Sequence, residues 1–377
     1  MTELVKLATV TETIMGQAPS SHDCNKDGTG TPFVKAGEFG LSRPVIKEWT
    51  TNPLKFAKYD DVLLCVVGAT CGKINKGFDG AIGRSVAAVR AKPEFIDKDY
   101  LYYFLQTWSL RLRAMSQGAA QTVITRDMIG NLEIYLPPLE EQRRIASILD
   151  QADELRQKRQ QAIEKLDQLL QATFIDMFGD PVSNPKGWDK EKMDTLMTIV
   201  RGGSPRPIEN FLGGTYPWIK IGDATKGDDL FITKTKEAIT EEGLHKTRLL
   251  PEGSVIFANC GVSLGFARIL KIQGCIHDGW LAFQDISEDK IHKLFLLKAL
   301  NSITQYFRDT APDGTQPNLN TAIMKNFELI IPPMDLQLKF IDIVESIVKQ
   351  KKILETSNIE FANLFESLQN QAFNGTL

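Results

Sequence analysis

One segment of the sequence has nearly the spacing of a phosphate-binding loop, but it lacks the residues that such a loop needs. It runs Gly68-Ala69-Thr70-Cys71-Gly72-Lys73-Ile74. In a nucleotide-binding loop the glycines stand one residue further apart, and the lysine is followed by Ser or Thr, whose hydroxyl binds magnesium. A similar Gly-x-x-x-Gly pattern at 261 to 265 has no lysine at all. We therefore predict a tight turn between two strands instead of a nucleotide site.

Other candidates for catalytic chemistry are equally incomplete. His277 stands beside a carboxylate and an aromatic residue in His277-Asp278-Gly279-Trp280, but a histidine in such a place is more often solvated or packed in a core than a ligand. The acidic pair at 288 and 289 precedes a helical pattern and fits a helix start better than a metal site. No Asn-Pro-Pro-Tyr or Asp-Pro-Pro-Tyr element for methylating an exocyclic amine occurs. The sequence thus offers no catalytic constellation and no metal site.

Composition places the chain among soluble globular proteins of two or three domains. It has 377 residues, of which 42% are hydrophobic and 24% charged, and its apolar runs are far shorter than the ~20 residues of a membrane span. The N-terminus lacks a signal-peptide pattern, and the five cysteines form no C-x-x-C pair. We therefore expect a cytoplasmic protein without a disulfide framework.

The net charge of -3 excludes binding to nucleic acid by bulk charge alone. It conceals a local excess, because the segment from Lys35 to Lys92 contains ten basic and five acidic residues. The charge distribution therefore allows a basic face on one part of the protein.

The sequence repeats itself at a shift of about 195 residues. Leu-Pro-Pro-Leu-Glu-Glu-Gln at 136 to 142 aligns with Ile-Pro-Pro-Met-Asp-Leu-Gln at 331 to 337, and the two Gly-x-x-x-Gly segments align with each other. Further upstream, Phe-Val-Lys-Ala-Gly at 33 to 37 aligns with Trp-Ile-Lys-Ile-Gly at 218 to 222. Each unit is a mixed strand-and-loop head followed by a long helix. Within the first head, Tyr100, Tyr102 and Tyr103 fall on a helical pattern, which favours core packing over a stacking platform for bases.

Each Pro-Pro element leads into a helix with apolar residues in alternating steps of three and four, the pattern of a coiled coil. The first helix carries this seam on Ile148, Ala152, Leu155, Ala162, Leu166 and Leu169, and the second on Phe340, Val344, Ile347, Leu354, Phe361, Phe365 and Leu368. Arg159, Lys351 and Asn358 interrupt the seams, either to fix register or because a solvated edge tolerates them. At 1.5 Å per residue each helix is roughly 50 to 55 Å long.

These patterns predict two α/β (α+β) heads separated by two long helices that pair as an antiparallel coiled coil, with an internal pseudo-two-fold repeat. The expected boundaries are 1–136 for the first head, 137–180 for the central helix, 181–331 for the second head and 332–377 for the distal helix.

The helical segments resemble the conserved regions of type I restriction-modification specificity subunits. The resemblance rests on Leu-Pro-Pro-Leu-Glu-Glu-Gln-Arg-Arg-Ile-Ala-Ser-Ile-Leu-Asp at 136 to 150, on the continuation to Met-Phe-Gly-Asp-Pro at 177 to 181, and on the weaker Pro-Pro-x-x-x-Gln copy. The second copy departs from the pattern at Leu336 and Lys339, where the first has Glu141 and Arg144. In architecture the resemblance covers the whole chain.

The resemblance implies a non-catalytic subunit that reads an asymmetric bipartite site in double-stranded DNA, with one target recognition domain for each half-site. It also implies two adenine methyltransferase subunits and motor-nuclease subunits as partners, and S-adenosylmethionine, ATP and Mg as cofactors of those partners. This chain would hold no cofactor of its own. A nuclease or methyltransferase with a duplicated body and a coiled-coil protein adaptor are the alternatives.

Family members resemble one another in two glycine-containing loops of each head, and polar side chains in such loops are candidates for DNA contact. Glutamine and asparagine can pair with adenine, and arginine or lysine with guanine, although phosphate contact is the commoner role of a basic residue. The predicted DNA-binding residues are Gln17, Lys35, Lys73, Arg84, Gln121 and Arg126 in the first head, and Ser204, Arg206, Lys220, Arg248, Arg268, Gln316 and Asn318 in the second.

Exposed faces of the two helices are expected to bind the partner subunits. The predicted partner-binding residues are Glu141, Arg144, Ile148, Leu155, Leu166, Val344, Leu354 and Phe361.

Overall fold

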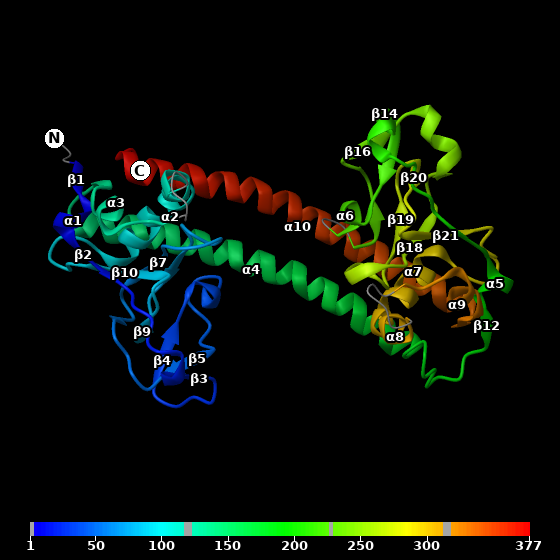
Figure 1. Ribbon diagram of the computed structural model, residues 1–377, viewed down its shortest axis with the longest axis horizontal. Coiled ribbons are helices and arrows are strands. Elements are labelled where there is room, and N and C mark those ends of the chain that lie inside the picture. Colours follow the sequence, from blue (N-terminus) through cyan, green and yellow to red (C-terminus); the bar gives the residue numbers. More distant parts are fainter. Residues whose placement is uncertain (1–3, 117–122, 226–228, 312–317) are drawn as a thin grey trace. The chain divides into compact units, whose positions relative to one another are not determined.

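The computed structural model describes residues 4–116, 123–225, 229–311 and 318–377, and it divides into two compact units (Figure 1). Unit 1 comprises Met1–Gln161 and Glu355–Leu377, and unit 2 comprises Ala162–Leu354. Each unit contains one head and part of two long helices, α4 (Leu139–Phe178) and α10 (Met334–Asn374). The boundary between the units therefore passes through both helices.

The head of unit 1 contains two main sheets and one long helix. One sheet has the antiparallel order β2-β10-β7-β8, and the other has the order β3-β5-β4-β9-β6, in which only β4 and β9 are parallel. Helix α2 packs on β7, β8 and β10, and a third pair joins β1 to β11. The elements are β1 (Leu4–Lys6), α1 (Leu7–Val10), β2 (Thr11–Met15), β3 (Cys24–Asn25), β4 (Thr31–Val34), β5 (Glu48–Thr50), β6 (Phe56–Ala57), β7 (Val62–Cys65), β8 (Ile74–Lys76), β9 (Gly80–Ile82), β10 (Val86–Ala91), α2 (Lys98–Ser116), α3 (Arg126–Gly130) and β11 (Glu133–Tyr135).

The head of unit 2 is built in the same way. Its sheets have the orders β13-β21-β18-β19-β15 and β16-β14-β20-β17, and a third pair joins β12 to β22. The elements are β12 (Lys190–Lys192), α5 (Met193–Leu196), β13 (Thr198–Arg201), β14 (Leu212–Ile219), α6 (Ile221–Ala224), β15 (Phe231–Ile232), β16 (Glu237–Ile239), β17 (Arg248–Leu250), β18 (Val255–Ala258), β19 (Ala267–Leu270), β20 (Gly274–Ile276), β21 (Trp280–Gln284), α7 (Lys293–Ser302), α8 (Thr304–Thr310), α9 (Thr321–Asn326) and β22 (Glu328–Ile330).

The predicted repeat is confirmed in the strand order that the two heads share. Strands β2, β10, β7 and β8 correspond to β13, β21, β18 and β19. In the other sheet, β4 runs parallel to β9 with Val34 beside Ile82, and β14 runs parallel to β20 with Ile219 beside Ile276. The two heads differ at their sheet edges, because β3 extends one sheet of the first head and β15 extends the other sheet of the second.

The Gly-x-x-x-Gly segments are strand-to-strand turns, as predicted. Gly68 and Gly72 have φ values of 94° and 91°, and Gly261 and Gly265 have 72° and 104°, which is the left-handed region that favours glycine. A Cβ at Gly72 would lie 2.5 Å from the Ser109 carbonyl oxygen. The first segment therefore forms a tight turn that connects β7 to β8 beneath α2.

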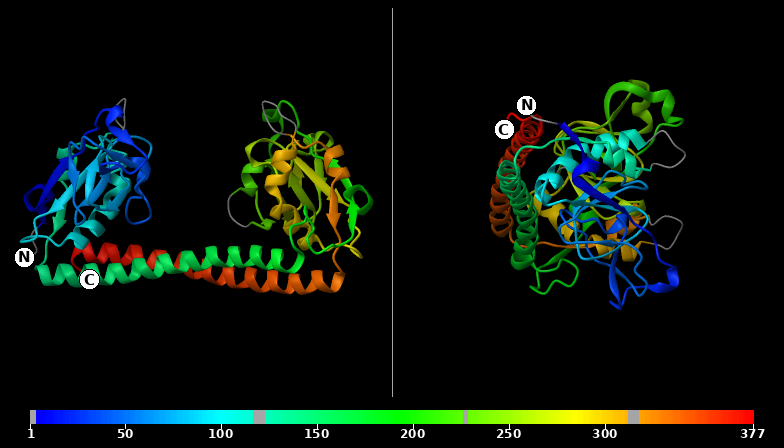
Figure 2. Two further views of the ribbon diagram at one scale, coloured as in Figure 1. Left: turned by 90° about the horizontal axis from the view of Figure 1, so that it is seen from below. Right: turned by 90° about the vertical axis from the view of Figure 1, so that its left-hand side faces the viewer.

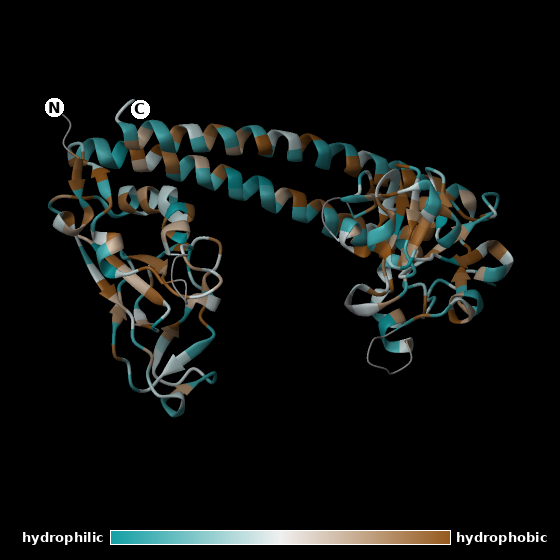
Figure 3. Cartoon of the chain, turned by 45° about the horizontal axis from the view of Figure 1, so that its top comes forward, coloured by the Kyte–Doolittle hydropathy of each residue, from teal (hydrophilic) through white to brown (hydrophobic). Residues whose placement is uncertain are grey.

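The tyrosines of α2 belong to the core, which confirms the prediction. Tyr100, Tyr102 and Tyr103 are at most 2% exposed. The end of α10 packs against them, since the Phe373 ring centroid lies 5.1 Å from that of Tyr100. Figure 3 shows hydrophobic colour on the inner strands of each head and mixed colour along the long helices. The C-terminal end of α10 thus completes the core of unit 1.

Within unit 1 the two long helices pair antiparallel. Arg144 of α4 donates to the Leu377 carbonyl oxygen at 3.0 Å. Further along α4, Arg159 donates to the hydroxyl and carbonyl oxygens of Ser357 at 2.9 and 3.2 Å and lies over the Phe361 ring. The partner residue number falls as the α4 number rises, so the helices run in opposite directions. Arg159, which interrupts the predicted seam, forms a specific contact across it.

Unit 2 repeats the antiparallel pairing with different side chains. Lys351 of α10 donates to Asp167 of α4 at 2.6 Å. Toward the end of α4, the rings of Phe174 and Phe178 lie 5.5 and 5.4 Å from that of Phe340. These rings join Phe295 of α7 in the core, so the head and both helices share one apolar cluster.

The seam of α4 differs in part from the prediction. Leu155 and Leu169 are 42% and 53% exposed, whereas Ile163 and Leu170 are only 9% and 3% exposed. The cause is that each stretch of α4 packs against a head as well as against α10, and the head lies on one side of the helix pair in each unit (Figure 2). The buried face of α4 therefore differs from the face that pairing with α10 alone would bury.

A buried glutamine joins each head to the helix that follows it. The Gln142 side chain is almost fully buried; its oxygen accepts from the Asp97 amide at 2.8 Å, and its nitrogen donates to the carbonyls of Phe95 and Pro137. Gln337 accepts from the His292 amide at 2.9 Å and donates to the carbonyls of Lys290 and Pro332. The Pro-Pro-x-x-x-Gln repeat therefore encodes a hydrogen-bonded joint between head and helix.

In the part of the chain that the structure describes, no helix is long and apolar enough to cross a membrane.

We expect Gln142→Leu, which keeps the side-chain volume, to destabilise unit 1 by about 2–4 kcal/mol, because the Asp97 amide and two carbonyls lose their buried partner. Urea unfolding combined with amide hydrogen exchange at residues 95–100 measures the loss. Gln151→Leu on the exposed side of α4 is the control and should change stability by less than about 0.5 kcal/mol. Equal effects of the two substitutions on stability would contradict a stabilising role of the buried Gln142 hydrogen bonds.

Candidate nucleic-acid interface

Three of the residues predicted to bind DNA in the first head come together at one end of its sheets. Gln17 follows β2, Lys35 follows β4, and Arg84 lies in the turn between β9 and β10. The Gln17 amide donates to the Ile82 carbonyl at 3.0 Å, and the Gly83 amide donates to the Val34 carbonyl at 2.9 Å. We call Gln17, Lys35 and Arg84 loop cluster 1.

Backbone packing holds this cluster tightly. A Cβ at Gly16 would lie 2.2 Å from the Gly83 carbonyl oxygen, so only glycine permits the approach of the two loops. Lys35 forms a 2.5 Å ion pair with Glu48, while Arg84 is exposed. Loop cluster 1 thus presents one cation that is paired within the head and one that points to solvent.

The second head places Ser204, Arg206 and Lys220 in the equivalent position. The Gly203 amide donates to the Ile276 carbonyl at 3.2 Å, which matches the contact of Gln17. Lys220 pairs with Glu237 at 2.5 Å, as Lys35 does with Glu48. Here Asp278 takes the place of Arg84. We call Ser204, Arg206, Lys220 and Asp278 loop cluster 2.

Asp278 organises the second cluster. Its carboxylate accepts from the Ser204 hydroxyl at 2.7 Å and pairs with Arg206 at 3.5 Å. Partial burial raises the pKa of Asp278, but the hydrogen bond from Ser204 and the nearby positive charge outweigh it, so the pKa lies below its usual value. The Arg206 side chain is 80% exposed, and a pocket of about 570 Å³ is lined by Ser204, Arg206, Lys220, Glu237 and His277, among others.

His277 precedes Asp278 and supports the turn beside loop cluster 2. The Gly279 amide lies 2.6 Å from Nδ1, and the Ile221 amide lies 3.2 Å from Nε2. Both ring nitrogens therefore face amide donors, which favours the neutral ring over the protonated one. Burial lowers the pKa of His277. The neutral ring therefore supports the turn that carries Asp278.

Other predicted DNA-binding residues lie apart from the two clusters. Lys73 donates to the Phe39 carbonyl at 2.7 Å, and Arg268 is 7% exposed and pairs with Asp229. Asn318 accepts from Asn259 at 3.3 Å, and Arg248 donates to the Arg201 carbonyl at 3.2 Å at the margin of loop cluster 2. Gln121 and Gln316 lie outside the described residues.

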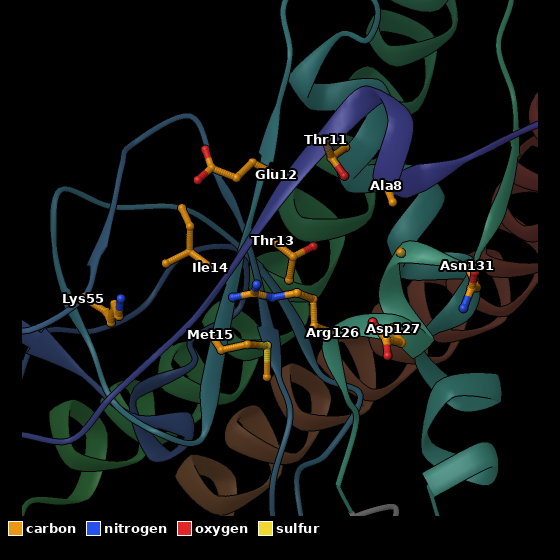
Figure 4. A pocket seen from close by; sticks show the side chains of 11 residues that line it. Ala8, Thr11, Glu12, Thr13, Ile14, Met15, Lys55, Arg126, Asp127 and Asn131 are labelled. Carbon is orange, nitrogen blue, oxygen red and sulfur yellow. The ribbon is translucent and has the colours of Figure 1, made fainter.

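Arg126 lines a separate surface pocket of about 460 Å³ in the first head. It extends from α3 toward Thr13 and Met15 of β2, whereas Asp127 and Asn131 lie at the other side of the pocket (Figure 4). The pocket is open and of mixed polarity, and Lys55 is the other basic residue that lines it. Among the described residues, no group of three His, Cys, Asp or Glu side chains could hold a metal ion.

The predicted partner-binding residues also have varied surroundings. Val344 is 1% exposed within unit 2, so it packs against its own head. Glu141 and Arg144 form an ion pair at 2.6 Å on the surface of α4. Leu155 is the most accessible of the apolar set at 42%, while Ile148, Leu166, Leu354 and Phe361 are partly buried.

Comparison with known proteins identifies the family. The family described as "Type I restriction modification DNA specificity domain" matches residues 2–165 and 185–361. The chain belongs to this family. Specificity subunits of type I systems are non-catalytic, and this chain is accordingly a DNA-binding, non-catalytic subunit of a restriction-modification system.

Individual relatives agree with this assignment. The putative type I restriction enzyme MjaX specificity subunit of Methanocaldococcus jannaschii is 36% identical over 40% of this chain, and the match spans 37% of that relative. The MjaVIII specificity subunit of the same organism is 25% identical over 90% of this chain and 82% of its own. The type I restriction-modification S subunit from M. genitalium has a TM-score of 0.58 at 17% identity, covering 98% of this chain and 96% of its own, which shows a shared fold.

A chain solved in a study of complex assembly and conformational transition of the type I R-M system is similar as well. It has a TM-score of 0.64 at 19% identity and covers 100% of this chain and 98% of its own. The paired-helix and two-head architecture of the specificity subunit is therefore the shared fold of these proteins.

Sequence reasoning missed Asp278 as a site residue, although the repeat contained the signal. At a shift of 194 residues, Ile82-Gly83-Arg84 aligns with Ile276-His277-Asp278. The structure places both triplets in the same turn after a parallel strand. Aligning the heads turn by turn would have found it.

Unit 2 is expected to lose stability as the pH falls below about 6.5, the ordinary histidine pKa in an unfolded chain. Burial lowers the pKa of His277 and His292 in the folded state, so the unfolded chain takes up protons first and acid favours unfolding. Urea unfolding between pH 5 and pH 8 measures this slope.

The double variant His277→Gln/His292→Asn should flatten the pH dependence, because amides cannot titrate and the side-chain oxygen of an asparagine can still cap α7. His22→Gln, at an exposed position of unit 1, serves as the control and should leave the slope unchanged. If the double variant and the parent show the same slope, the two histidines do not cause the pH dependence of stability.

Proposed function

We propose that this subunit reads an asymmetric bipartite site in double-stranded DNA, with one head for each half-site. The observation that carries the proposal is that loop clusters 1 and 2 share one backbone frame but differ in the side chains they present. Arg84 offers guanidinium donors where Asp278 offers carboxylate acceptors. Arginine pairs with guanine and a carboxylate accepts from cytosine N4, so equivalent turns would read different bases.

The remaining cations of the clusters fit backbone contacts. Lys35 and Lys220 follow parallel strands in equivalent positions, and each is held by a carboxylate. Such a lysine is positioned for a phosphate oxygen, which fixes register on the duplex without reading sequence. Arg206, exposed at the rim of its pocket, can reach either a base or a phosphate.

The chemistry of modification and cleavage is assigned to other subunits. In this proposal two adenine methyltransferase subunits and the motor-nuclease subunits bind the specificity subunit, and they carry the sites for S-adenosylmethionine, ATP and Mg. A methyltransferase flips its target base out of the duplex, so this chain has only to hold the duplex at the correct register. The assembled complex would act in the cytoplasm.

Arg84→Glu should weaken binding of the methyltransferase complex to its duplex by about tenfold or more, since one base or phosphate contact is worth about 1–3 kcal/mol. Fluorescence anisotropy at two salt concentrations distinguishes the roles: loss of a phosphate contact reduces the salt dependence, and loss of a base contact relaxes specificity at one position. Arg111→Glu on α2 makes the same charge change as a control. Unchanged affinity at both salt concentrations would remove Arg84 from the interface.

Replacing residues 181–331 with the corresponding head of another family member should change one half of the methylated motif only. Single-molecule methylome sequencing of cells that express the chimera with the cognate methyltransferase gives the motif directly. The parent should yield an asymmetric bipartite motif with modified adenine in both halves. A change in both halves of the motif would contradict the assignment of one head to each half-site.

A further inference from the structure

Each unit has a groove between the head and the helix that follows it, and the two grooves overlap at equivalent positions of the repeat. In unit 1 the groove lies between the start of α2 and α4. In unit 2 it lies between the start of α7, α10 and the strands β15 and β19. The buried glutamines fix the correspondence, because Gln142 binds the Asp97 amide and Gln337 binds the His292 amide. Asp97 and His292 are themselves equivalent, since each side chain accepts an amide at the start of its helix.

The groove of unit 1 is acidic. Its volume is about 520 Å³, and Asp97, Asp99, Asp150 and Glu154 line it together with a single cation, Arg143. Lys76 lies behind it and binds Asp99 and Asp150 at 3.1 and 3.0 Å. Even with that lysine the groove keeps an excess of carboxylates.

The groove of unit 2 is apolar at its floor and basic at its rim. Its volume is about 460 Å³, and its floor consists of Phe231, Ile269, Leu294, Val344 and Val348. The rim carries Lys271, Lys293, Lys349 and Lys352 and one carboxylate, Glu345. Lys293 is paired with Glu288 at 2.8 Å, whereas Lys349 and Lys352 are exposed on α10.

One equivalent position of the repeat carries opposite charges in the two grooves, whereas Asp150 and Glu345 carry the same charge. Glu154 of α4 corresponds to Lys349 of α10, and Asp99 of α2 corresponds to Leu294 of α7. The backbone joint is the same in both units, but β15 and β19 also line the groove of unit 2, so the two grooves differ in their walls as well as in their charges. The groove of unit 1 therefore attracts positively charged groups, and the groove of unit 2 attracts negatively charged groups.

We infer that the groove of unit 2 is the docking site for an acidic amphipathic helix of a protein partner, and that the groove of unit 1 does not bind this helix. The apolar floor favours a protein over nucleic acid, because a phosphate backbone has no apolar face to cover Leu294 and Val348. The lysine rim selects carboxylates and speeds association at low salt. This inference rests on the proposed function, in which the partner is the methyltransferase subunit.

The consequence is that two identical methyltransferase subunits bind the two units with different chemistry. Both positions share a frame, but only the unit 2 position gains from acidic residues on the partner. Binding at that position should weaken with salt more steeply than binding at the other.

The test uses the full chain with its cognate methyltransferase as the probe, and native mass spectrometry over a salt series to count bound subunits. Lys349→Glu/Lys352→Glu should weaken one binding step by about tenfold and flatten its salt dependence. Lys349→Gln/Lys352→Gln should give a smaller loss and avoids placing two like charges beside Glu345. Glu154→Lys, at the equivalent position in unit 1, is the matched control and should not weaken either step.

Each outcome decides the inference. If both lysine variants bind two methyltransferase subunits as the parent does, the inference is wrong. If they keep methyltransferase binding but lose affinity for duplex DNA, the groove serves nucleic acid and the inference is again wrong. Failure of the parent chain to bind the methyltransferase or the duplex would overturn the proposed function itself.

Discussion

The buried joint between each head and its following helix is the interaction on which the rest of the structure depends. Gln142 and Gln337 are at most 1% exposed, and each satisfies one backbone amide and two carbonyls. An unpaired backbone group in such a place costs about 1–3 kcal/mol, so the joint permits one orientation of head and helix. The positions of the loop clusters and of the grooves both follow from it.

Much of the fold could be predicted because its signals are local. The helices follow from their apolar periodicity, and the repeat follows from motifs that recur along the chain. The exposed position of Leu155 could not be predicted, since burial of α4 depends on a head as well as on α10. A helical pattern shows that one face is apolar, but it does not show which elements divide that face between them.

The candidate site was harder to predict, because a basic residue in a loop has several possible partners. Lys35 and Arg84 lie together in loop cluster 1, but Lys73 donates to the Phe39 carbonyl and Arg268 is buried beside Asp229. Their hydrogen bonds depend on tertiary packing, which charge and glycine content do not reveal. Asp278 was missed for the opposite reason, since a carboxylate is not expected in a DNA-reading loop until the turn that carries it is aligned with its counterpart.

The repeat separates residues that build the frame from residues that can differ. The glycines of the two Gly-x-x-x-Gly turns, the paired parallel strands and the buried glutamines are the same in both units. A change at these places would strain the backbone or leave a buried polar group without a partner. Arg84 and Asp278, like Glu154 and Lys349, lie outside that buried network, where a substitution costs little stability. A single frame used twice can therefore carry opposite charges at equivalent positions, and this is the physical basis on which one chain could read two different half-sites and offer two different grooves to its partners.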